Sequence, residues 1–356
     1  MYILCVREQP AENREWISFA KGAAIILVVL YHASLFLNDL GLAGSTPRLR
    51  LVLSFFPMPV FFFIAGLTAR RMLTWNLKDL WRRRLLTLVY LYLLWSVIRV
   101  VFYLVIPHLR GTERSPTDLV NIALLPVWPT SSYWFIWALA IFTLLAWLLR
   151  KIPVRVQLVL AGVVAILSTT PGLLDLDNVG WDRVVANFVF FLAAVYFPHT
   201  FYRLAARVRL WHAFALVALY VGVAVLLVPL HLSRVPGLIL LESAIAIAMG
   251  VALATLLVRV KSLNFMNVLG QYSFQIYLLH LFLVAGALAL VAPFADSPAL
   301  ERAGNVLPFA LAAVVLVLSL YLAKFLRRFS FLWVSPLRRR QTKSVSRPAH
   351  LNGDLL

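Results

Sequence analysis

Lys21 and His32 are the residues whose types and spacing most strongly favour chemistry in this chain. Both lie in the apolar stretch from Arg14 to Leu37, which is long enough to cross a bilayer. A cation and an imidazole inside hydrocarbon are unfavourable unless they face a cavity or a partner. The two are eleven positions apart, which at about 100° per residue places them within about 20° of one helix face. An imidazole titrates near neutral pH, so His32 could act as a general base.

Two interpretations of this pair remain open. In the first, Lys21 and His32 lie on one helix face that forms part of an active site in the bundle interior. Burial there keeps the imidazole uncharged and basic. In the second, Lys21 snorkels to the cytosolic headgroups, and His32 hydrogen-bonds a neighbouring helix. At about 1.5 Å per residue, His32 lies roughly 22 Å from Ile17, past the midplane of a hydrocarbon core about 30 Å thick.

Two further ionisable residues lie well inside apolar segments. His280 is roughly 13 Å into the segment that begins near Tyr272, and it could be a partner base, an oxyanion donor or an interhelix hydrogen-bonding residue. Glu242 is the only carboxylate placed deep in such a segment. Because a lone glutamate in the membrane is unfavourable, we expect it to face a cavity and to pair with His32, His280 or Arg99.

A cluster of arginines follows the second apolar segment. Guanidinium groups match the oxygens of phosphate groups, and we select Arg71, Arg82 and Arg84 as candidate ligand-binding residues. The alternative is membrane topology, because the positive-inside rule alone places arginines on the cytosolic side. The sequence contains no metal-ligand spacing, glycine-rich phosphate loop or serine-elbow motif, so we expect no metal. The full cluster is Arg70, Arg71, Arg82, Arg83 and Arg84.

The elements that must position these residues are membrane helices. The chain has 356 residues, of which 62% are hydrophobic, well above the apolar share of a soluble domain. The net charge of +19 lies in short runs between apolar segments, which favours membrane topology and excludes nucleic-acid binding. We therefore predict an all-α polytopic bundle of about ten transmembrane helices. The predicted spans are 17–37, 49–69, 85–106, 133–149, 156–172, 183–199, 211–229, 236–258, 272–294 and 304–326.

The distribution of Lys and Arg predicts the orientation. One set of alternate connections and termini holds 24 of these residues, and the other set holds seven, so both termini are predicted to be cytoplasmic. Residues 75–85 are predicted to form an interfacial helix or a lead-in to the third span. The loop 107–132 is predicted to be an ordered cap on the outer side. Residues 1–328 form the predicted membrane domain, and 329–356 a basic, disordered tail.

Four stretches of the chain together resemble a known family. They are the first span with Lys21-Gly22 and Tyr31-His32-Ala33, then FFPMPVFFFIAG from Phe55, then Tyr133-Trp134-Phe135, and finally GQYSFQIYLLH from Gly270. In this order they resemble membrane acyltransferase family 3, the integral-membrane O-acyltransferases of bacterial envelope sugars. The resemblance implies that Lys21 and His32 are the family's basic residue and essential histidine. It also places functional arginines near the third span, at Arg82 and Arg84. The family often has an acidic residue where this chain has Ser18.

The resemblance implies a bacterial inner-membrane enzyme that uses cytosolic acyl-CoA, with acetyl-CoA favoured, to acylate a hydroxyl of an envelope glycan or glycolipid. His32 would be the base or an acyl relay, and the 3'-phosphate and pyrophosphate of CoA would meet the arginines. Because His32 lies deep, the pantetheine arm must thread into the bundle, or the acyl group must move in relay. The alternative from another class is a transporter or glycan exporter whose Lys21, His32, Glu242 and His280 line a polar pathway. A scaffold without a site is the third possibility.

Overall fold

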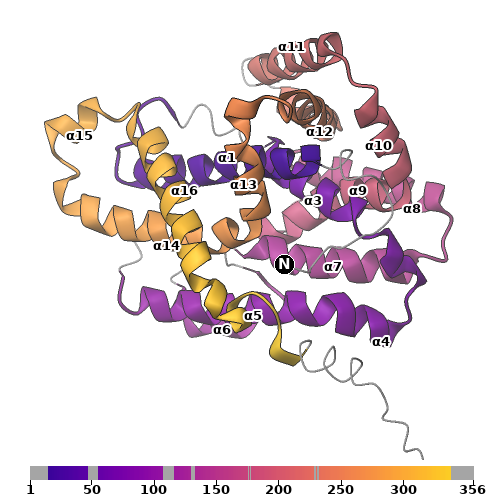
Figure 1. Ribbon diagram of the computed structural model, residues 1–356, viewed down its shortest axis with the longest axis horizontal. Coiled ribbons are helices and arrows are strands. Elements are labelled where there is room, and N and C mark those ends of the chain that lie inside the picture. The colour runs from indigo at the N-terminus through magenta and orange to yellow at the C-terminus, as the bar shows by residue number, and fades with distance from the viewer. Residues whose placement is uncertain are drawn as a thin grey trace, which may run out of the picture.

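A computed structural model describes residues 15–46, 55–106, 116–129, 133–174, 176, 178–227, 230 and 232–337, and within these ranges the chain is helical and contains no strand (Figure 1). A helix lies in each of the ten predicted ranges. Together the apolar helices confirm an all-α multi-pass membrane fold. The ten helices are α1 (Glu15–Asp39), α3 (Pro57–Leu67), α5 (Leu86–Tyr103), α7 (Trp134–Leu149), α8 (Val154–Thr169), α9 (Val179–Tyr196), α11 (Leu210–Leu227), α12 (Leu238–Leu257), α14 (Ser273–Val291) and α16 (Leu307–Phe325).

Length and composition separate these helices into two groups. Among the described residues, five helices are long and apolar enough to cross a bilayer, namely Glu15–Asp39, Leu77–Tyr103, Leu238–Leu257, Ser273–Phe294 and Leu307–Arg328. A sixth candidate is the pair Gly180–Tyr196 and Pro198–Ala206, which bends by 83° at its break. Four apolar helices are shorter, so the count of ten spans and the cytoplasmic termini stay predictions. The short helices are Pro57–Leu67, Trp134–Leu149, Val154–Thr169 and Leu210–Leu226.

Proline and local caps explain where several helices begin. Pro57, Pro198 and Pro308 occupy the first turns of α3, α10 (Pro198–Ala206) and α16, where a missing N–H leaves no hydrogen bond unmade. Asn76 caps α4 (Leu77–Leu80) by accepting a hydrogen bond from the Asp79 amide at 2.8 Å. A π-helical turn, η4 (Trp81–Leu85), then continues directly into α5. The segment 75–85 is therefore a lead-in to the third span.

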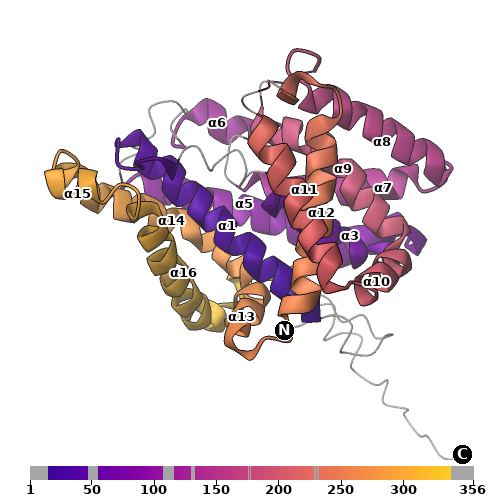
Figure 2. The same cartoon turned by 90° about the horizontal axis from the view of Figure 1, so that it is seen from above.

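Helix α1 is the axis of the bundle. It packs against α3, α12, α14, α16 and the short helix α13 (Phe265–Gln271). Figure 2 shows α1 running between α14 and α16 on one side and α11 and α12 on the other. Its buried residues join both apolar clusters of the molecule, with Val29 in one and Ala24 in the other. Any residue on α1 is thus held between two halves of the bundle.

Two other segments attach to this core. In the loop 107–132, Asp118 caps α6 (Leu119–Leu124), and Trp137 Nε1 donates to the Pro126 carbonyl at 3.0 Å. Residues 116–129 therefore form an ordered cap, while 107–115 and 130–132 lie outside the described residues. The prediction of a disordered tail from residue 329 is wrong for 329–337. Trp95 Nε1 donates to the Leu332 carbonyl at 3.0 Å, and the Trp333 ring packs 5.7 Å from that of Trp95. Aromatic side chains bind this segment to α5; residues 338–356 lie outside the described part.

Two glycines let α1 and α13 touch backbone to backbone. A Cβ built on Gly22 would overlap the Met266 carbonyl oxygen, and one on Gly270 would overlap the Ser18 carbonyl oxygen. Only glycine allows this approach, and small residues serve the same purpose in other membrane helix pairs. This contact holds α1 against α13, the short helix that directly precedes α14.

We expect Gly270→Ala to lower the stability of the protein by about 2 kcal/mol, because the added methyl must push two backbones apart. The measurement is the temperature at which the detergent-solubilised protein loses its monodisperse elution peak. Gly286→Ala on α14 is the matched control, since a Cβ there meets nothing within 4 Å and alanine favours a helix. An equal response of the two variants would contradict the proposed role of the close contact.

Candidate active site

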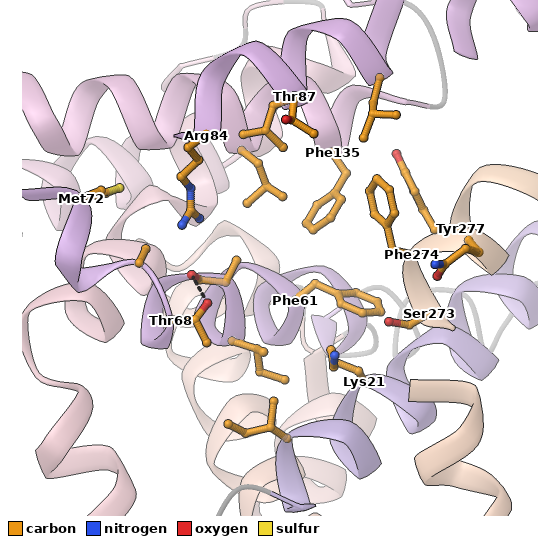
Figure 3. A pocket seen from close by; sticks show the side chains of 18 of the residues that line it. Lys21, Phe61, Thr68, Met72, Arg84, Thr87, Phe135, Ser273, Phe274 and Tyr277 are labelled. Atoms are coloured by element: carbon orange, nitrogen blue, oxygen red, sulfur yellow. Dashed lines mark hydrogen bonds between the residues drawn. The ribbon is translucent and has the colours of Figure 1, made fainter. Parts of the chain in front are cut away.

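A cavity of about 620 Å³ opens among α1, α3, α5, α7 and the first turn of α14 (Figure 3). Its wall is mostly apolar, with Phe61 of α3 and Phe135 of α7 as large contributors. The polar groups converge from three directions: Lys21 from α1, Ser273 from α14 and a group of arginines before α5. Such a mostly apolar cavity with a few convergent polar groups is typical of a ligand-binding site.

Positive charge lines this cavity on two sides. Figure 3 shows Arg84 and Lys21 on opposite sides of the open space. Arg84 is held in place because its Nε donates to Thr143 Oγ1 of α7 at 3.1 Å. The Lys21 ammonium has no hydrogen bond or ion pair with the part of the chain that the structure describes. The first amides of α14 add the positive end of a helix dipole near Ser273. The cavity therefore suits a ligand with anionic groups.

The arginines predicted to bind a ligand are placed differently from one another. Arg71 and Arg84 line the cavity, whereas Arg82 is exposed and does not. Arg83 belongs to the predicted cluster but was not among the three selected arginines, and it lines the cavity instead. It forms an ion pair with Asp79 at 3.4 Å. The π-helical turn carries all three consecutive arginines, and its widened turn changes which side chains face inward. Sequence periodicity assumes a regular helix and does not reveal that turn.

His32 and His280 meet across the interface of α1 and α14. His280 Nε2 lies 3.4 Å from His32 Nδ1, and the ring centroids are 5.0 Å apart. His280 is fully buried, and His32 is partly buried. Across this interface the side chain that His32 contacts is thus a second imidazole. The sequence placed both histidines inside the bundle, and the structure brings them together.

Backbone carbonyls determine how the two rings carry their protons. His280 Nδ1 lies 2.8 Å from the Tyr277 carbonyl oxygen, which only accepts, so this nitrogen bears the hydrogen. The same argument applies to His32 Nδ1, which lies 2.8 Å from the Val28 carbonyl. The one hydrogen on His32 Nδ1 points to the Val28 carbonyl at 2.8 Å, so the 3.4 Å contact with His280 Nε2 is the weaker branch of a shared hydrogen bond, and the basic lone pair of His32 is on Nε2. If Nε2 takes a proton, the Nδ1–H becomes a stronger donor to both acceptors.

Tyr277 links the cavity to the histidine pair. Its side chain lines the cavity, and it precedes His280 by three residues on α14, with ring centroids 6.0 Å apart. Neither histidine lines the cavity itself. Lys21 and His32 therefore serve different parts of the site, since Lys21 lies in the cavity wall and His32 lies about three helical turns further along α1.

Glu242 lies apart from this site. The expectation that it pairs with His32, His280 or Arg99 is wrong for the described residues, whereas a cavity beside Glu242 stays a prediction. Glu242 is fully buried in α12, neither carboxylate oxygen has a hydrogen-bond partner, and it does not line the cavity. Helix α12 packs on α11, α1 and α3, so its inner face meets apolar side chains such as Phe56. The position of a residue within an apolar segment does not show which neighbouring helix its side chain faces.

The comparisons with known proteins give the class of this site. The family model described as an acyltransferase domain matches residues 14–327. The chain belongs to this family, as its motifs indicated, and it is a membrane acyltransferase. No curated protein sequence and no solved structure matches it. The matched range includes both histidines, Lys21 and all the cavity-lining arginines.

We expect His32→Ala to lower acyl transfer by about 10²- to 10⁴-fold, the usual contribution of a positioned general base. His280→Ala should lower it by about tenfold, because one neutral hydrogen bond that orients His32 is lost. The measurement is transfer of a radiolabelled acyl group by purified protein in nanodiscs. His212→Ala is the control, since that ring stacks on Trp211 away from the site. Equal losses for His280 and His212 variants would contradict the positioning role.

Proposed function

We propose that this acyltransferase takes an acyl group from cytosolic acyl-CoA and transfers it to a hydroxyl of a bacterial envelope glycan or glycolipid. The observation that carries the proposal is a cavity with Arg71, Arg83 and Arg84 in its wall and a histidine pair beyond its inner side. The arginines would hold the 3'-phosphate and pyrophosphate of CoA. Lys21 would supply a further positive charge for the donor.

The middle of the cavity fits the pantetheine arm. Thr87 Oγ1 and Gln275 Oε1 are buried and have no hydrogen-bond partner in the described residues, and both residues line the cavity. Buried polar atoms without partners are rare and unfavourable, so a ligand that brings amide groups would relieve them. Threonine in a helix has two accessible side-chain rotamers, which allow its hydroxyl to turn toward a ligand.

The histidines would act on the acceptor. The acceptor hydroxyl oxygen attacks the thioester carbonyl carbon while His32 Nε2 removes its proton. The carbon–sulfur bond breaks, the thiolate leaves with the electron pair, and it later takes the proton from His32. Throughout, His280 orients His32 through the Nδ1 hydrogen bond at 3.4 Å. The charge that develops on His32 is shared within a buried hydrogen-bonded pair, which keeps the barrier low.

The predicted orientation of the chain supports a different side of the membrane for each substrate. The arginine-rich segment 70–84 belongs to the connections predicted to be cytosolic, where acyl-CoA is available. His32 is predicted to lie past the midplane, toward the other side. An acceptor would therefore approach from outside the bacterial inner membrane. The rival, a transport pathway along Lys21, His32, Glu242 and His280, has less support, because only Lys21 of these four residues lines the described cavity.

A binding experiment distinguishes the contribution of the phosphate-bearing nucleotide of CoA from that of its pantetheine arm. Titration calorimetry of the protein in nanodiscs with CoA, and with adenosine 3',5'-bisphosphate, tests the two parts. We expect Arg83→Gln to weaken both ligands by about tenfold, and Thr87→Val to weaken CoA alone by about three- to tenfold. Ser96→Ala is the matched control, since Ser96 is a buried hydroxyl on the same helix, also without a partner, that does not line the cavity. Failure of the unaltered protein to bind either ligand would overturn the proposed donor.

Envelope glycans reveal the acceptor. We expect glycans from cells that contain the protein to carry one additional acyl group per modified sugar, and glycans from cells with His32→Ala to lack it. Mass spectrometry of the isolated glycans measures the gain and names the acyl group. Immunoblotting of membranes provides the control for protein level. Substrate movement across the membrane without acyl-CoA consumption would favour the transporter instead.

A further inference from the structure

The side of the cavity away from Arg84 is walled by aromatic rings. Phe61 of α3, Phe135 of α7 and Tyr277 of α14 all line the cavity. The ring centroids of Phe61 and Phe135 are 5.8 Å apart, and those of Phe135 and Tyr277 are 5.5 Å apart. Figure 3 shows Tyr277 on the side opposite Arg84, with Phe135 between them. We call these three side chains the aromatic wall.

Other aromatic side chains pack against the residues of the aromatic wall. Phe135 and Tyr277 are 8% and 7% exposed, so little of either ring is free to move. Phe62 packs on Phe135 with ring centroids 4.8 Å apart, and Tyr133 packs on Tyr277 at 6.2 Å. Tyr133 is itself fixed, since its hydroxyl donates to the Leu278 carbonyl at 3.0 Å. Dense packing of this kind resists displacement, because a ring can move only if its neighbours move too.

The aromatic wall stands where an acyl group would have to fit. A donor whose phosphates meet the arginines extends its thioester toward Tyr277, and Tyr277 lies one helical turn from His280. The acyl carbons then lie against Phe135 and Phe61. No long apolar channel is needed for a small acyl group, whereas a long chain would have to displace rings.

We propose that the aromatic wall limits the length of the acyl group, so that the enzyme prefers an acetyl group to longer acyl groups. This inference rests on the proposed use of acyl-CoA as donor. One methylene that does not fit a packed pocket changes the specificity of an enzyme by about 10- to 200-fold, so a four-carbon group should already be strongly disfavoured. Truncation of a wall ring should remove this discrimination.

The experiment compares acetyl-, butyryl- and octanoyl-CoA with the unaltered protein and Phe135→Ala. We expect the unaltered protein to prefer acetyl-CoA over butyryl-CoA by at least about tenfold, both in transfer and in equilibrium binding by calorimetry. Phe135→Ala should bring the butyryl-to-acetyl ratio close to one in both measurements. Phe61→Ala is a second variant, because Phe61 is less buried than Phe135 and its loss disturbs the core less.

The matched control is Phe142→Leu. Phe142 lies on the same helix as Phe135 and packs on Phe62 at 4.7 Å, but it does not line the cavity. The control should keep the unaltered preference for acetyl-CoA. An unaltered protein that uses octanoyl-CoA as well as acetyl-CoA would overturn the inference alone, as would wall variants that change all donors equally. A protein that neither binds nor uses any acyl-CoA would instead overturn the proposed function.

Discussion

The contact between His32 and His280 is the interaction on which the candidate site depends. The hydrogen on His32 Nδ1 points to the Val28 carbonyl at 2.8 Å and is shared with His280 Nε2 at 3.4 Å, while His280 Nδ1 donates to the Tyr277 carbonyl at 2.8 Å. These carbonyls fix the tautomers, so the basic nitrogen of His32 follows from geometry. A carboxylate in place of His280 would hold the proton more tightly and would have to be desolvated. A neutral partner avoids a buried charge before the reaction begins.

That contact depends in turn on how α1 is placed along the bundle. Gly22 and Gly270 bring α1 against α13, and the chain then breaks at Tyr272 before α14 starts. The break lets the first turn of α14 face the cavity, while Ser273, Tyr277 and His280 follow at successive turns. One helix thus lines the cavity at its start and carries a histidine of the site one to two turns later. A continuous helix would aim its first amides into its own preceding turn.

The sequence predicted the helices and their order well, because apolar runs between charged connections determine membrane spans almost without tertiary information. It also placed His32 and His280 inside the bundle and left open whether Lys21 faces the interior or the headgroups. It gave His280 as one possible partner of His32 without deciding between it and Glu242, since which helices touch depends on packing of small residues. The inward face of Arg83 depends on a π-helical turn, and no pattern in WRRRL shows one. The predicted pairing of Glu242 was wrong because the position of a residue along a helix does not show which neighbouring helix its side chain faces.

The separation of the histidines from the cavity has a chemical consequence. A base exposed in a wide cavity would activate water as readily as a sugar, and the thioester would be hydrolysed. Here neither histidine lines the cavity, and Tyr277, which does, stands between the open space and His280. In the proposed reaction, a hydroxyl that arrives from the opposite side would meet His32 before it meets the thioester. Such an arrangement would favour transfer of the acyl group over its loss to water.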